Sequence, residues 1–131
     1  MRENNSILKD KSFAFAISIV QLYKFLVEER KEFVLSKQIL RSGTSIGANI
    51  REAKNAESTN DFLHKLGIAR KECDETIYWL ELLKETNYIE MGKFLIPFDE
   101  ADQILKITKS TILTIKQKSQ TCRRACICYR H

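Results

Sequence analysis

Residues 62–83 read FLHKLGIARKECDETIYWLELL, and their apolar side chains recur with the period of a helix. The residues that share one face follow alternating steps of four and three: Phe62, Leu66, Ala69, Cys73, Thr76, Leu80 and Leu83. Ser58, Thr59 or Asn60 can cap the start of this segment. The stretch therefore predicts an amphipathic helix from about Asn60 to Thr86.

The preceding segment, from about Ser36 to Glu57, has the same periodicity, with Ser36 as the expected N-cap. Its centre is unusual for a helix, because Gly43 and Gly47 each cost about 1 kcal/mol relative to alanine there. Small residues on one face allow another backbone to come close, so we expect a tight helix crossing at these glycines. A phosphate-cradling glycine loop is the disfavoured alternative, because no strand precedes it.

Two further helices are predicted on either side, from about Asp10 to Arg30 and from about Phe98 to Ser119. Residues 87–97 form the expected connection, with the only proline at its end, where a helix can begin. No segment alternates like a strand. The predicted fold is all-α, an antiparallel up-down-up-down four-helix bundle over residues 1–119. Residues 120–131 form a basic, cysteine-rich tail that is expected to be poorly ordered.

The apolar stripe of the first predicted helix covers about half of its circumference, which is wider than one core face requires. Such a helix is either central in the fold or buries a second face against another subunit. The stripe therefore fits a homo-oligomer as well as a central helix.

The charge of the chain is concentrated at its C-terminal end. The 131 residues, 44% hydrophobic and 30% charged, are typical of one soluble globular domain, and the net charge is only +5. After Asp102, however, the chain has seven basic residues and no acidic one. These side chains predict a stripe that contacts nucleic-acid phosphates, with no aromatic residues interleaved for base stacking. The candidate binding residues are Lys106, Lys109, Lys116, Lys118, Arg123 and Arg124.

The stretch from Gln38 to Ala53, QILRSGTSIGANIREA, resembles the signature of the four-helix bundle proteins encoded in 23S rRNA intervening sequences. The resemblance continues through Tyr78-Trp79-Leu80-Glu81-Leu82-Leu83 and covers most of the chain. The family is related to the accessory variability protein of diversity-generating retroelements. The residues after about Ser119 have no counterpart in the pattern.

The resemblance implies an antiparallel bundle that assembles as a homopentamer around a central channel. It also implies RNA or DNA binding without enzymatic activity, beside a reverse transcriptase in the retroelement relative. The polar residues of the signature, which we interpret as structural before functional, are Arg41, Ser45, Asn49 and Glu52. A homo-oligomeric scaffold that recruits a protein partner without binding nucleic acid is the alternative function.

The sequence contains no arrangement of catalytic residues, so an enzyme is not expected. Cys122, Cys126, Cys128 and His131 do not have a usual zinc spacing, and we expect neither a metal nor another cofactor. No segment resembles a secretory signal or a membrane span, so a cytoplasmic protein with no membrane partner is expected.

Overall fold

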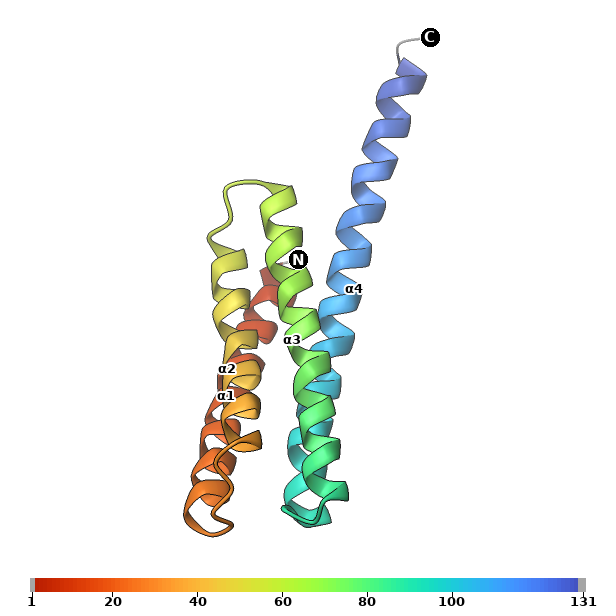
Figure 1. Cartoon of the computed structure of the whole chain (residues 1–131). Coiled ribbons are helices and arrows are strands. Elements are labelled where there is room, and N and C mark those ends of the chain that lie inside the picture. The colour runs from red at the N-terminus through yellow and green to blue at the C-terminus, as the bar shows by residue number, and fades with distance from the viewer. Residues whose placement is uncertain (1, 130–131) are drawn as a thin grey trace.

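The computed structural model describes the backbone of residues 2–129 and the side chains of residues 5–124. It contains four helices and, within this described part, no strand: α1 (Arg2–Glu28), α2 (Leu35–Lys54), α3 (Thr59–Glu85) and α4 (Met91–Tyr129). Each helix runs antiparallel to the one before it, as Figure 1 shows. The prediction of an all-α, four-helix bundle is confirmed.

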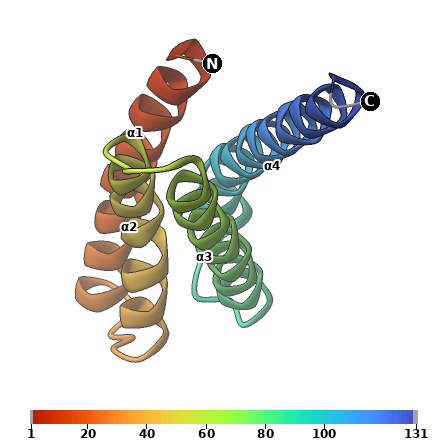
Figure 2. The ribbon, with the colours of Figure 1, turned by 90° about the horizontal axis from the view of Figure 1, so that it is seen from above.

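The helices are arranged in a closed ring, in which α1 contacts α2, α2 contacts α3, α3 contacts α4 and α4 returns to α1. Seen from above, α4 leaves this ring and points away from the other three helices at its C-terminal end (Figure 2). The C-terminal end of α4 also rises past the connection between α2 and α3 (Figure 1). The described part of the chain therefore consists of a packed body and one projecting helix end.

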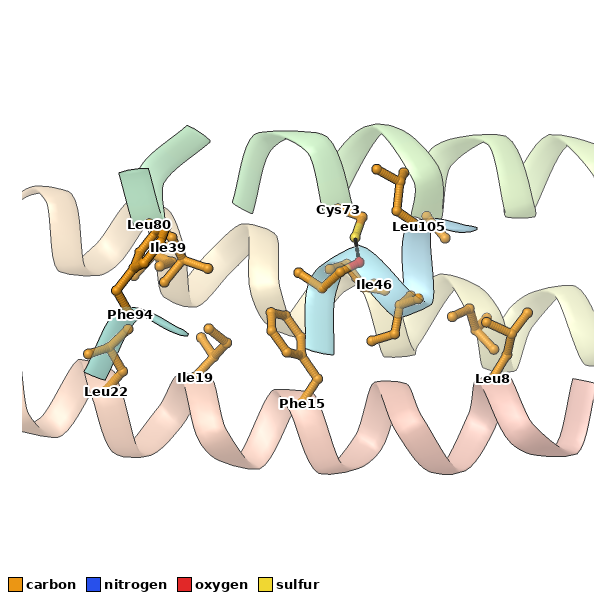
Figure 3. Close-up of a cluster of buried hydrophobic side chains, with 14 of the residues drawn as sticks. Leu8, Phe15, Ile19, Leu22, Ile39, Ile46, Cys73, Leu80, Phe94 and Leu105 are labelled. Carbon is orange, nitrogen blue, oxygen red and sulfur yellow. Dashed lines mark hydrogen bonds between the residues drawn. The ribbon is translucent and has the colours of Figure 1, made fainter. Parts of the chain in front are cut away.

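The core runs along the axis of the body and receives side chains from all four helices (Figure 3). Phe15, Ile46 and Leu80 are fully buried, each with 0% of its surface exposed. The predicted face of α3 is confirmed, since six of its seven members are buried and Phe62 packs against the core at its edge. Burial of these apolar surfaces is the main contribution to stability, about 25 cal/mol for each Å².

The two glycines of α2 lie where α1 crosses it, as the sequence predicts. A Cβ atom added at Gly43 would be 2.8 Å from Cγ2 of Ile19, closer than any side chain tolerates. One added at Gly47 would be 3.4 Å from the backbone oxygen of Ser12. The close approach of α1 therefore explains the glycine at position 43, whereas a Cβ at position 47 would be in ordinary van der Waals contact.

The start of α2 is capped by a different residue from the one predicted. Ser36 lies inside the helix and is buried, and the capping group is the carboxylate of Glu32. Its oxygens accept hydrogen bonds from the backbone N–H groups of Val34, Leu35 and Ser36 at 3.0, 2.9 and 2.6 Å. The prediction of Ser36 as N-cap was wrong because a side chain before the helix reaches the same donors. At α3, Ser58 is the N-cap, with its hydroxyl accepting from Asp61 N at 3.1 Å.

The first and last helices of the chain, α1 and α4, are longer than the sequence periodicity predicts. The first begins at Arg2 rather than about Asp10, and Leu8 in the added turns is fully buried. The last begins at Met91, so Pro97 lies inside it, and it continues past Ser119 to Tyr129. A proline in a helix costs about 3 kcal/mol. Here the first turns of α4 are held by buried Phe94, whose ring stacks on Phe98 at 5.1 Å.

Candidate nucleic-acid interface

The cationic residues predicted to bind nucleic acid are all on α4, and all are exposed: Lys106, Lys109, Lys116, Lys118, Arg123 and Arg124. Lys106 alone among them has an acidic partner within the described side chains. Its Nζ lies 2.9 Å from the carboxylate of Asp102, which raises the pKa of the lysine. The remaining five cations follow Asp102 in a segment that contains no acid. Their positive charge is therefore available to an external anion.

The spacing of these cations places them on defined sides of α4. At about 100° per residue, Lys109, Lys116 and Arg123 are seven residues apart and follow one side of the helix. Lys118 is two residues from Lys116 and lies on the opposite side. Three of the six cations therefore form one line, Lys118 lies across the helix from it, and Lys106 and Arg124 lie about a quarter turn from it.

The cationic end of α4 leaves the body because its side chains have no apolar surface to bury. Ile115 is the last buried residue among the described side chains, and Lys116–Arg124 are all exposed. This segment reads KQKSQTCRR, which contains no aliphatic or aromatic side chain. A helix without an apolar face cannot gain stability by packing on the core. It therefore continues past the body as a single exposed helix (Figure 1).

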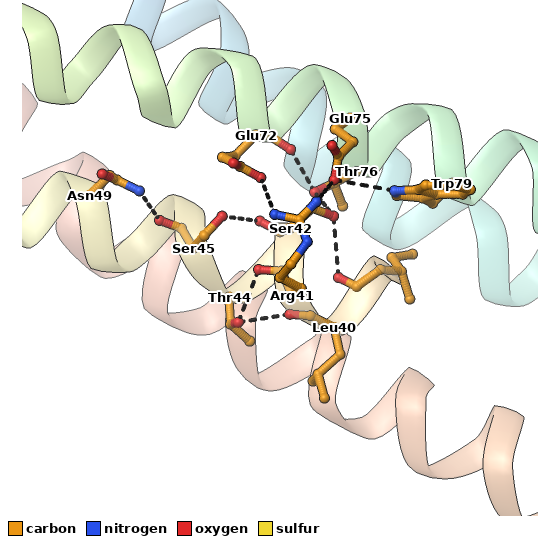
Figure 4. A network of polar contacts seen from close by, with 11 residues as sticks. Leu40, Arg41, Ser42, Thr44, Ser45, Asn49, Glu72, Glu75, Thr76 and Trp79 are labelled. Atoms are coloured by element: carbon orange, nitrogen blue, oxygen red, sulfur yellow. Dashed lines mark hydrogen bonds and ion pairs between the residues drawn. The ribbon is translucent and has the colours of Figure 1, made fainter. Parts of the chain in front are cut away.

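The polar residues of the signature, in contrast, contact other residues of the same chain, and Figure 4 shows three of them, Arg41, Ser45 and Asn49. The guanidinium of Arg41 forms ion pairs with Glu72 and Glu75 of α3. Asn49 donates to the carbonyl of Ser45 at 2.8 Å, and Glu52 pairs with Lys65 at 2.8 Å. Their interpretation as structural residues agrees with these contacts, since each one stabilises α2 or its packing on α3.

A buried hydroxyl pair joins the same two helices in the core. Thr76 and Ser42 are both 0% exposed, and their hydroxyl oxygens lie 2.9 Å apart. Thr76 also reaches the backbone oxygen of Glu72 at 2.7 Å. No described buried side-chain nitrogen or oxygen lacks a hydrogen-bond partner. These hydroxyls therefore hold the register of α2 on α3, and each has at least one hydrogen-bond partner.

The described residues contain no cluster suited to metal binding, and the buried Cys73 is not a reactive nucleophile. Within residues 5–124, no group of three histidine, cysteine or acidic side chains could hold a metal ion. Cys73 is fully buried, and this desolvation raises its pKa to about 12, so it remains a neutral thiol that contacts the carbonyl of Ala101 at 3.1 Å. Cys122 is exposed, whereas the side chains of Cys126, Cys128 and His131 lie outside the described residues.

The outer face of α1 is a second exposed surface, and it is apolar. Phe13, Ile17 and Val20 are 54%, 47% and 36% exposed. A hollow of about 340 Å³ lies beside Phe13, between α1 and α2, and the guanidinium of Arg51 lies 5.3 Å from the centre of that ring. The sequence predicted an apolar stripe wider than one core face, and α1 has such a stripe. None of the described helices is long and apolar enough to cross a bilayer.

The chain is similar to one known protein family and to a solved structure. The family model described as 23S rRNA-intervening sequence protein matches residues 4–110. A crystal structure of a protein of unknown function from the S23 ribosomal protein family of Bacteroides thetaiotaomicron is 57% identical, with a TM-score of 0.82. The match covers 83% of this chain and 97% of that one. No match was found among the curated proteins.

Proposed function

The chain belongs to the 23S rRNA-intervening sequence protein family, and on this basis we propose that it is a non-enzymatic, homo-oligomeric nucleic-acid-binding protein. The binding surface is the cationic line of α4, which docks on the phosphate backbone of RNA or DNA. Phosphate contacts position a nucleic acid and carry little sequence information. Binding through this line alone is therefore weakly sequence-specific.

The observation that carries this proposal is the separation of charge along the chain. Before Asp102 the bases are balanced by acids, and Arg41 and Lys65 are held in ion pairs. After it, five exposed cations have no acidic partner among the described side chains. Phosphates are the polyanions that such a line fits, because each contact releases a condensed counterion.

The test is a titration of fluorescent RNA and DNA with the full chain at several salt concentrations. We expect the affinity to fall steeply between about 50 and 200 mM salt. Reversal of Lys109, Lys116 and Arg123 to Glu should abolish binding at the higher salt. The matched control reverses Lys37, Lys54 and Lys71, which are exposed on α2 and α3. Equal loss in both variants, or an affinity indifferent to salt, contradicts the proposal.

Assembly into a homo-oligomer, a pentamer by resemblance, is supported by the exposed apolar face of α1. Covering Phe13, Ile17 and Val20 removes apolar surface from water, which favours association. Light scattering at micromolar concentration should give a mass several times that of one chain. Phe13→Asp with Ile17→Asp should reduce it to one chain, whereas Tyr78→Asp, at an exposed aromatic of α3, should not. A monomeric wild-type protein contradicts this part of the proposal.

The same apolar face favours a second candidate function, a scaffold that recruits a protein partner such as a reverse transcriptase. In that case α1 binds the partner, and the cations of α4 have no role. Co-purification that is lost with Phe13→Asp but unaffected by reversal of Lys109 and Lys116, together with no nucleic-acid binding, would favour the scaffold.

A further inference from the structure

The projecting end of α4, residues 116–124, lies beyond the part of the chain that the family model matches. The family model ends at residue 110, and the Bacteroides protein is covered almost completely by 83% of this chain. The function of this segment must therefore be inferred from its own side chains. All of them are exposed, and all except Cys122 are strongly polar.

The side chains of this segment are sorted by type around the helix. Gln117, Gln120, Thr121 and Arg124 follow the spacing i, i+3, i+4, i+7 and therefore share one face. Lys116 and Arg123 border this face on one side, and Lys118 borders it on the other. The reverse of the helix, in line with buried Ile115, has only Ser119 and Cys122. One face thus has hydrogen-bonding side chains between two cationic edges.

This arrangement fits the major groove of B-form DNA. The groove is about 12 Å wide and admits an α-helix of about 10–12 Å diameter. Cations on both edges of the helix reach the two phosphate strands that border the groove. Between them, glutamine can pair with N6 and N7 of adenine, and arginine with O6 and N7 of guanine.

We infer that residues 116–124 form a recognition helix that lies in the major groove of duplex DNA and contacts base edges through Gln117, Gln120 and Arg124. This inference rests on the proposed function, since it narrows the nucleic acid bound by the same cationic end of α4. The major groove of an A-form RNA duplex is too deep and narrow for a helix. Single strands are bound on aromatic platforms, and residues 103–124 contain no aromatic residue.

Residues 116–124 are also already helical before any docking, because they continue the earlier turns of α4. Extension of an existing helix avoids the unfavourable nucleation step that an isolated short helix faces. The backbone is helical throughout this segment, and the hydroxyl of Thr121 donates to the carbonyl of Gln117 at 2.9 Å. The side chains on both cationic edges of this segment are exposed and therefore open to an approaching duplex.

The first experiment compares three probes of the same sequence by fluorescence anisotropy with the full chain. They are a DNA duplex of about two helical turns, the corresponding RNA duplex and the single DNA strand. We expect the DNA duplex to bind at least about tenfold more tightly than the RNA duplex. Equal, salt-sensitive binding of all three overturns the recognition helix and leaves the proposed function intact. Binding of none of them overturns both.

The second experiment tests whether the helical form is needed. Gln120→Pro breaks the helix without changing its charge and lies outside the body, so the body remains folded. We expect it to remove the preference for the DNA duplex, whereas Ser119→Ala, on the reverse of the same helix, retains it. Circular dichroism melting confirms that both variants are folded. If Gln120→Pro keeps the full preference, the inference is overturned.

The third experiment selects bound sequences from a random duplex library. Enrichment of a defined base sequence that includes both A·T and G·C pairs is expected with the wild-type chain. Gln117→Ala with Gln120→Ala should relax the selected bases while the salt dependence is unchanged. Lys116→Ala with Lys118→Ala should keep the selected bases and reduce the salt slope by about two units. No enrichment with any variant overturns the assignment of base contacts.

Discussion

The crossing of α1 on α2 and the far end of α4 are both regular helix, yet their structures are determined by opposite means. At the crossing, Gly43 leaves no room even for a methyl group, and the surrounding side chains are buried. At the far end, every side chain of residues 116–124 is exposed and most are polar. The difference shows that packing determines the body, whereas charge determines what the projecting end can contact.

The largest expected difference is between a buried aliphatic side chain at the crossing and an exposed one on α4. Ile46→Ala deletes a fully buried side chain and should lower the free energy of unfolding by about 2–5 kcal/mol. Leu113→Ala, at a residue 58% exposed on α4, should change it by less than about 0.5 kcal/mol. Urea unfolding followed by circular dichroism measures both. Similar losses in the two variants would show that the side chain of Leu113 is packed and not exposed.

The second difference is between two glycines in helices. Gly43→Ala should destabilise the protein by about 1 kcal/mol, because overpacking against Ile19 exceeds the gain in helix propensity. Gly67→Ala should stabilise it by up to about 1 kcal/mol, because nothing lies within 4 Å of the added methyl group. The melting temperatures of the two variants should therefore shift in opposite directions from that of the wild type. Shifts of the same sign would contradict the close crossing.

The third prediction concerns pH, and it depends on Glu32 at the start of α2. Desolvation acts to raise the pKa of this carboxyl, but hydrogen bonds from Leu35, Ser36 and Val34 N–H groups outweigh it and lower the pKa. A pKa depressed by folding stabilises the protein above the unfolded value, near 4.5, and this stabilisation is lost as the pH falls through the folded value. Glu32→Gln should therefore cost about 1 kcal/mol at neutral pH and little in acid.

The control for this pH effect is Glu52→Gln, since Glu52 is exposed and its ion pair with Lys65 lies at the surface. Exposed pairs contribute little, so this variant should unfold with nearly the wild-type pH dependence. A Glu32→Gln variant whose stability still falls in acid as steeply as that of the wild type would contradict the capping role.

The smallest expected effect on stability is that of removing charge from the projecting end. Lys116→Gln with Lys118→Gln and Arg123→Gln should change the unfolding free energy by less than about 0.5 kcal/mol. Because the substitutions relieve repulsion between like charges, we expect the free energy of unfolding to rise slightly. The same variant should lose most of its nucleic-acid binding. A large loss of stability would indicate that this end packs on the body.

Much of the fold and the composition of the candidate site could be predicted from local periodicity. The face of α3 from Phe62 to Leu83 and the glycine crossing at Gly43 follow from residue spacing alone. The ends of the helices could not be predicted in this way. Pro97 signals a helix start locally, but burial of Phe94 holds the preceding turns in α4. Ser36 is a residue type that often caps helices, but the carboxylate of Glu32 accepts the hydrogen bonds from the N–H groups at the start of α2.

The sequence by itself determined the four helices, their buried faces and the concentration of cations after Asp102, because periodicity and charge are local properties. Only the tertiary structure decided which charges are paired, as for Arg41, and where α4 leaves the body, at Ile115. The physical reason is that burial and ion pairing depend on neighbours distant in the chain, whose positions are set only when the helices pack together.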